Sequence, residues 1–169
     1  MSPDPIGSTY IKYKGPYDFD GLYKLVHKWI KERRYHLEEK RYKDKIDNPT
    51  GTEVEIEVQG KKKVTPYIRY WIDVGIHAYD YMEKEGMLHG KKQYYTDGRV
   101  TIQIVTSIEF DWQNRFNSGK AAKIMKQFYH WIMKKEHELV YIDDVEYEAL
   151  RLEQEVKKFL KMETDTNAY

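Results

Sequence analysis

The chain has 169 residues, enough for one domain with a full hydrophobic core, and its 29 lysines and arginines nearly balance its 28 aspartates and glutamates. This balance disfavours a domain devoted to nucleic acid, which usually carries a basic excess. Because there is no cysteine, disulfides, thiol nucleophiles and cysteine-ligated metal sites are excluded. No apolar run approaches the roughly 18 residues of a membrane span, and the N-terminus lacks the regions of a signal peptide. We therefore expect a cytoplasmic protein without a membrane partner.

The first predicted elements are a strand and a helix. Residues 9–14 (TYIKYK) alternate in polarity and stop at Gly15-Pro16, which predicts a strand. Two prolines among the first five residues suggest a flexible arm over residues 1–8. Between Asp18 and Arg34, acidic residues come first and basic residues last, as the helix dipole favours. The predicted apolar stripe of this helix is Phe19, Leu22, Val26, Trp29 and Ile30.

Four strands are predicted after this helix. Residues 36–46 (HLEEKRYKDKI) are thinly apolar and predict an exposed edge strand, followed by a turn at residues 47–51. Residues 52–58 (TEVEIEV) alternate strictly, which predicts a strand with its valines and isoleucine inward and its glutamates outward. Gly60 and the Lys61–Lys63 run predict the next turn.

The next strand lies in residues 65–86 (TPYIRYWIDVGIHAYDYMEKEG). Its even positions from Ile68 to Ala78 are mostly aliphatic, whereas its odd positions are aromatic or polar, so one face should be buried and the other open. Turns are predicted at residues 85–90 and at Asp97-Gly98, a typical hairpin signal. The last long strand covers residues 99–112, and its predicted buried side is Val100, Ile102, Ile104, Ile108 and Phe110.

The C-terminal third predicts two helices. Ser118 can cap the first, whose apolar residues are Ala121, Ile124, Met125, Phe128, Trp131 and Ile132. Asp143 or Asp144 can cap the second, whose inner stripe is Val145, Ala149, Leu152, Val156 and Phe159. We expect the helices and strands to share one core, whose predicted members are Val26, Trp29, Ile68, Ile72, Val74, Ile76, Val100, Ile102, Ile104, Ile108, Phe128 and Ile132. Residues 164–169 are expected to fray, which leaves a single domain at residues 9–163.

The predicted order of elements is β-α-β-β-β-β-α-α. Consecutive strands followed by helices favour an α+β fold, with helices packed on one face of an antiparallel sheet. This order resembles the TATA-binding-protein and helix-grip groups of folds. The resemblance is one of topology, so it implies an arrangement of elements and no activity.

Four short sequence words add a second resemblance. They are YKG at residues 13–15, DFDGLY at 18–23, KKVTPYIRYW at 62–71 and DWQNRF at 111–116. By these words the chain resembles, over most of its length, a group of small uncharacterised archaeal proteins. None of the words is a catalytic signature, so this resemblance implies an ancient intracellular domain and no active site.

The patterns of known catalytic and metal sites are weak or missing. The six histidines form no HExxH motif and no i, i+4 pair, so we predict no metal site and no cofactor. Residues 117–120 (NSGK) lack the upstream glycine of a phosphate-binding loop, and neither GxGxxG nor GxSxG occurs. The outward glutamates Glu53, Glu55 and Glu57 would make an acid–base pair only in an unusual setting, since such residues normally solubilise a strand. We expect a protein that is not an enzyme.

The candidate site is the outward face of residues 67–79. Large aromatic side chains beside an arginine match the composition of protein interfaces, and Gly75 in the same row would admit a close approach or a bend. We predict that this face contacts a partner protein or forms a homo-oligomer. The predicted contact residues are Tyr67, Arg69, Trp71, His77 and Tyr79.

Two alternatives stay open. The same aromatic residues would suit the stacking of nucleic-acid bases, with phosphate contacts from Lys61–Lys63 and from the basic segment 33–45. Glutamates on the same face oppose this nucleic-acid alternative. The second alternative is a small-ligand binder, because a helix-grip sheet can enclose an apolar cavity under its C-terminal helix.

Overall fold

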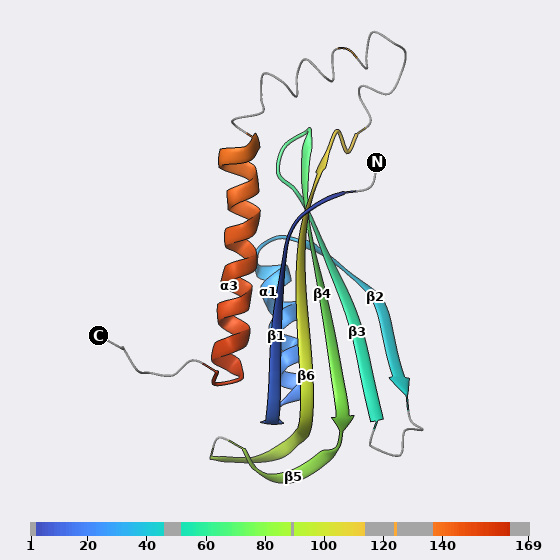
Figure 1. Cartoon of the computed structure of the whole chain (residues 1–169), viewed down its shortest axis with the longest axis vertical. Coiled ribbons are helices and arrows are strands. Elements are labelled where there is room, and N and C mark those ends of the chain that lie inside the picture. Colours follow the sequence, from blue (N-terminus) through green and yellow to red (C-terminus); the bar gives the residue numbers. More distant parts are fainter. Residues whose placement is uncertain (1–2, 46–51, 89, 114–123, 125–136, 163–169) are drawn as a thin grey trace, which may run out of the picture.

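The computed structural model describes residues 3–45, 52–88, 90–113, 124 and 137–162. These residues form an α+β fold, in which a six-stranded antiparallel sheet carries two helices on one face (Figure 1). The predicted fold class is confirmed. None of the described helices combines the length and the apolar character of a membrane span.

The elements follow one another along the chain with short connections up to the end of the sheet. In order they are β1 (Asp4–Tyr17), α1 (Phe19–Glu32), β2 (His36–Lys45), β3 (Thr52–Lys63), β4 (Ile68–Tyr81), β5 (Glu83–Leu88), β6 (Lys91–Phe110), the π-helical segment η1 (His137–Ile142) and α3 (Asp143–Phe159). The strand order across the sheet is β1-β6-β4-β3-β2, and β5 pairs with the first part of β6. β4 is therefore the central strand, and β1 and β2 lie at the two edges.

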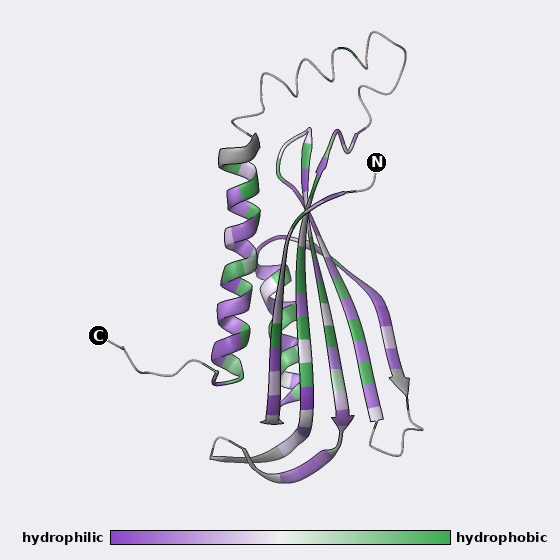
Figure 2. Ribbon diagram, viewed as in Figure 1, coloured by the Kyte–Doolittle hydropathy of each residue, from purple (hydrophilic) through white to green (hydrophobic). Residues whose placement is uncertain are grey.

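The core lies between the sheet and the two helices. The six inward side chains of β4, at the even positions from Ile68 to Ala78, are at most 2% exposed. The alternation along the strands is visible as bands of hydropathy in Figure 2. The predicted single core is confirmed for its described members, which are Val26, Trp29, Ile68, Ile72, Val74, Ile76, Val100, Ile102, Ile104 and Ile108. Its other two predicted members, Phe128 and Ile132, lie outside the described residues.

Helix α1 forms as its sequence predicts. The side chain of Asp18 caps the helix by accepting a hydrogen bond of 2.8 Å from the backbone N–H of Gly21. All five residues of the predicted stripe are buried. A Cβ atom at Gly21 would lie only 2.7 Å from a ring carbon of Phe159, so this glycine lets α1 and α3 approach closely.

Two strands are longer than predicted. β1 begins at Asp4 and continues past Gly15, so residues 4–8 pair with β6 instead of preceding the sheet. β3 runs through Gly60 and Lys61–Lys63, where we predicted a turn. Gly60 is buried, and a Cβ atom at this position would lie 3.2 Å from side-chain atoms of Ile30 and Tyr35. Gly60 therefore allows β3 to pack closely against Ile30 and Tyr35 of the core, and it does not end the strand.

The region between β4 and β6 contains a strand that the sequence did not predict. Residues 83–88 form β5, so the described residues after α1 contain five strands instead of four, and β6 begins at Lys91. The predicted hairpin at Asp97-Gly98 is wrong, because both residues lie within β6. A Cβ atom at Gly98 would lie 2.7 Å from the carbonyl oxygen of Tyr79, so this glycine permits two strands to lie close together.

The C-terminal helix α3 carries the predicted stripe. Four of its five residues are buried, and Phe159 is partly buried against the core. The predicted cap is wrong, because Ile142 occupies the cap position without a side-chain hydrogen bond and η1 leads directly into the helix. The predicted turn at 47–51 and the frayed tail at 164–169 lie outside the described residues, as does the predicted helix after Ser118 apart from Ile124.

Candidate interface on the open face of the sheet

No described helix packs on the second face of the sheet, which we call the open face. Four of the five predicted contact residues, Arg69, Trp71, His77 and Tyr79, occupy half-buried outward positions of β4 on this face. Tyr67 does not belong to it. This residue precedes β4, is 9% exposed and turns its ring into the core, 6.1 Å from the ring of Phe110.

Arg69 and Trp71 meet at a buried carboxylate near one end of the open face. Glu109, on β6 directly opposite Arg69, is 6% exposed. One of its oxygens accepts hydrogen bonds from Arg69 Nε at 2.8 Å, Arg69 Nη2 at 2.5 Å and Trp71 Nε1 at 2.9 Å. Charge-assisted bonds of this kind fix the arginine and the indole in one geometry.

Cations cover both tryptophans at this end. Lys61 Nζ lies 4.8 Å from the ring centre of Trp71, and the guanidinium of Arg69 lies 5.1 Å from it. Arg69 also lies 5.4 Å from the ring of Trp112, and Lys63 Nζ lies 4.9 Å from the same ring. We call these five residues the cation–tryptophan cluster. The sequence reasoning missed Trp112, although its DW dipeptide at the end of the last strand was the available signal.

His77 and Tyr79 form a second aromatic group at the other end of β4. Their rings stack with centres 3.9 Å apart, and the guanidinium of Arg99 lies 5.5 Å from the ring of Tyr79. His77 Nε2 also lies 3.7 Å from a carboxylate oxygen of Glu53 on β3. The two aromatic groups therefore lie on the same strand face but do not form one site.

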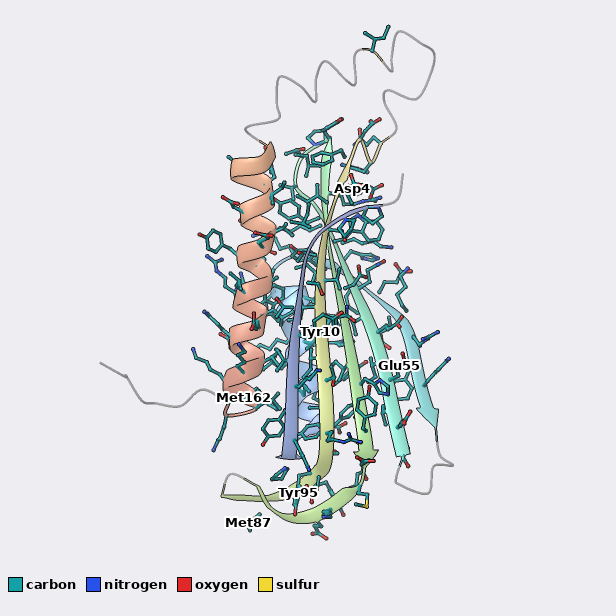
Figure 3. The ribbon with its side chains drawn as sticks, in the orientation of Figure 1. Asp4, Tyr10, Glu55, Met87, Tyr95 and Met162 are labelled. Atoms are coloured by element: carbon teal, nitrogen blue, oxygen red, sulfur yellow. The ribbon has the colours of Figure 1, made fainter. Side chains whose placement is uncertain are left out.

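Gly75 separates the two groups and leaves a hollow in the open face. A Cβ atom at this position would find no heavy atom within 4 Å. Two adjoining recesses of about 250 and 280 Å³ share Gly75, Glu57 and Gln103 among their lining residues, and together we call them the Gly75 hollow. Tyr10 and Glu55, labelled in Figure 3, also line it and come from strands on either side of β4.

Charged groups on the open face are mostly paired across strands. Arg41 lies 3.3 Å from Glu55 and 3.5 Å from Glu57. Gln59 donates a hydrogen bond of 2.5 Å to Asp73, and Lys61 pairs with Glu38. Such pairs between strands stabilise a solvated sheet surface. They also leave this face without a continuous basic track.

The covered face holds a second polar group, centred on Glu148 of α3. This carboxylate is 6% exposed, lies 2.8 Å from Lys62 Nζ and accepts a hydrogen bond from the hydroxyl of Tyr35. Burial, and then the bond to Glu148, raise the pKa of Tyr35 far above its ordinary value, so its hydroxyl remains a donor. The ion pair between Glu148 and Lys62 joins α3 to β3, so we assign this group to the anchoring of α3 on the sheet.

Metal ligands do not converge in the part of the chain that the structure describes, where no three histidine, aspartate or glutamate side chains form a group. No family model matches the sequence, and no curated protein is significantly similar to it. The resemblance to archaeal proteins therefore stays a prediction.

Proposed function

We propose that this chain is a non-catalytic binding domain that docks a partner protein on the open face. The observation that carries the proposal is the Gly75 hollow, which lies at the centre of a face that no described helix covers. Aromatic side chains flank the hollow, with Tyr10 on β1 and the stacked His77 and Tyr79 on β4. Aromatic residues around a recess are typical of the anchor points of protein interfaces.

The charges around the hollow favour a partner that presents lysine or arginine. Glu55, Glu57 and Asp73 line it, whereas Lys40 is the single lysine or arginine among the described lining residues. Arg41 lies on the β2 side and offsets part of this negative charge. A partner cation would extend these cross-strand pairs, and electrostatic complementarity of this kind selects a partner more than it adds affinity.

The cation–tryptophan cluster favours a protein partner over nucleic acid. A base can stack only on a free ring face, whereas Lys61 and Arg69 both lie over Trp71. The carboxylates of Glu38 and Glu109 pair with these same two cations. A phosphate backbone would therefore compete with existing ion pairs instead of meeting unoccupied cations.

The experiment uses two substitutions at one position. Gly75→Ala adds a methyl group where the structure leaves open space, and Gly75→Trp fills the hollow with an indole. Both variants should fold, which thermal unfolding checks. Two measurements follow: chemical crosslinking of partner proteins to the open face, and sedimentation to detect self-association. Gly75→Ala should give the same crosslinked proteins and the same assembly as the parent protein. Gly75→Trp should lose both.

Retention of the same crosslinked proteins and the same assembly in Gly75→Trp would contradict the proposal. A single-stranded RNA probe tests the alternative that the open face binds nucleic acid. If Gly75→Trp or Trp71→Ala instead abolishes binding of that RNA, and the binding weakens steeply with salt, the open face is a nucleic-acid surface.

A further inference from the structure

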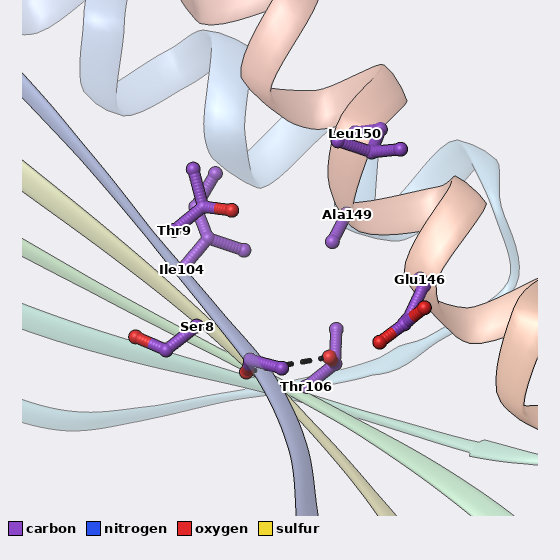
Figure 4. A pocket seen from close by; sticks show the side chains of 8 residues that line it. Ser8, Thr9, Ile104, Thr106, Glu146, Ala149 and Leu150 are labelled. Atoms are coloured by element: carbon purple, nitrogen blue, oxygen red, sulfur yellow. Dashed lines mark hydrogen bonds between the residues drawn. The ribbon is translucent and has the colours of Figure 1, made fainter.

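A separate recess lies on the covered side of the sheet, between the edge strand β1 and helix α3. Figure 4 shows it from close by, with Ala149 and Glu146 of the helix facing Thr9, Ile104 and Thr106 of the strands. Its volume is about 250 Å³. The complete lining consists of Gly7, Ser8, Thr9, Ile104, Thr106, Glu146, Ala149 and Leu150. This volume falls below the roughly 300–1,000 Å³ of most small-molecule sites and suits a single side chain.

The β1 side of the recess is an unpaired strand edge. In the described part of the chain β1 pairs only with β6. In an antiparallel edge strand every second residue turns its N–H and C=O away from its neighbour, so at least one of Gly7, Ser8 and Thr9 presents both groups outward. No proline lies between Gly7 and Gly15, so each residue of this stretch keeps its N–H donor.

The polar atoms of the recess are mainly oxygen acceptors. Thr106 donates its hydroxyl hydrogen to the carbonyl of Gly7 at 3.5 Å, which leaves lone pairs on both oxygens as acceptors. Glu146 adds an exposed carboxylate that has no hydrogen bond or ion pair to a described residue. Ile104, Ala149 and Leu150 supply an apolar wall. An ammonium group on an aliphatic stem matches this combination, because the stem can lie along the wall while the charge meets the oxygens.

We propose that the edge of β1 binds an extended basic peptide as an additional strand, with one lysine side chain in the recess and its ammonium group at Glu146. In strand addition the main-chain hydrogen bonds provide affinity, and alternate side chains of the peptide enter pockets on one face. Gly7 leaves room for the entering side chain, since a Cβ atom there would come within 3.5 Å of a Glu146 oxygen. This site lies on the opposite side of the sheet from the Gly75 hollow and does not depend on the function proposed for it.

The test uses the full chain and a capped pentapeptide, acetyl-Thr-Val-Lys-Val-Thr-amide. Titration by NMR should shift backbone amides of residues 7–15 and of the first turns of α3. Glu146→Gln should weaken binding about tenfold, the loss of one charge-assisted hydrogen bond. Glu155→Gln is the matched control, because Glu155 lies on the same helix but lines the groove toward α1, and it should leave binding unchanged.

Five further probes, three of them ligands and two of them protein variants, test the parts of the proposal separately. The peptide with Lys→Glu, and the peptide N-methylated at alternate amides, should both fail to bind. Gly7→Val should block the recess, whereas Gly75→Trp should leave peptide binding intact. Equal binding of the N-methylated peptide would overturn strand addition, and n-butylammonium binding as tightly as the peptide would show a small-amine site instead. Absence of any shift with the parent peptide would also overturn the proposal.

Discussion

On the covered face of β4, Tyr70, Ile72 and Ala78 are fully buried, while Trp71 and Tyr79 on the open face of the same strand remain half-exposed. The covered face is held by the removal of aliphatic surface from water, which is non-directional and tolerates little change in volume. The open face is held by directional pairs between strands, such as the Arg69–Glu109 ion pair. The even positions of this strand therefore stabilise the fold by burial, while its odd positions are partly exposed and several of them pair with residues of neighbouring strands.

The largest expected effect comes from truncating a residue of the covered face. Ile104→Ala removes most of a side chain that is 1% exposed, and it should lower the free energy of unfolding by about 2–5 kcal/mol. Val105→Ala is the matched change on the open face, where the side chain is half-buried, and should cost clearly less. Urea unfolding of both variants measures the difference. Equal losses for the two variants would show that the faces are not distinct in packing.

Adding one methyl group at a glycine of each face compares the packing of the two faces more finely. Gly60→Ala places a Cβ atom 3.2 Å from atoms of Ile30 and Tyr35, so overpacking should destabilise the protein by about 1–3 kcal/mol. Gly75→Ala meets no atom within 4 Å and should be neutral or stabilise by up to about 1 kcal/mol, because alanine restricts the unfolded chain. The difference between the two melting temperatures is the measurement. A destabilised Gly75→Ala variant would mean that the hollow is not open.

The smallest expected effect is a pH dependence at the rim of the covered face, where α1 meets β2. Burial and a 2.6 Å hydrogen bond to Glu39 raise the pKa of Tyr23 from 10.0 to about 12. Between these values the unfolded chain loses the phenolic proton while the folded chain keeps it, so stability should fall as the pH rises from about 10 to about 12.

Tyr23→Phe should make the free energy of unfolding fall less steeply over this pH range. Burial also raises the pKa values of Tyr17, Tyr35 and Tyr70, so the variant should retain a weaker dependence. Urea unfolding at several alkaline pH values, with the tyrosinate absorbance recorded in parallel, measures both quantities. If the free energy of unfolding fell equally with pH in the variant and in the parent protein, Tyr23 would not contribute to the pH dependence.

The sequence predicted the covered face well because each of its strands must bury every second residue. The strict alternation of β3, β4 and β6 and the stripe of α1 follow from that requirement alone. Glycine was the main source of error. Gly60 and Gly98 predicted turns, yet both sit where the core or a neighbouring backbone comes too close for a side chain, a condition that depends on residues distant in sequence.

The candidate interface was predicted in part. Arg69, Trp71, His77 and Tyr79 face outward as the alternation requires, but the same phase wrongly included Tyr67, which precedes the strand and turns into the core. The role of Glu109 depends on the pairing of β6 with β4, which juxtaposes residues about forty positions apart and has no local signal.

The late position of strand β6 in the sequence affects how the sheet forms during synthesis. It pairs with β1, β4 and β5, and its residues 91–110 leave the ribosome after all three. Among the described strands, β1 has no partner before β6 is made, because residues such as Tyr10 pair with β6, and β4 can pair only with β3. Long-range pairing of this kind slows folding and leaves nascent strands open to intermolecular contacts. The prolines at both ends of β1 and the charged side chains of β2 are suited to protect the growing chain during that interval.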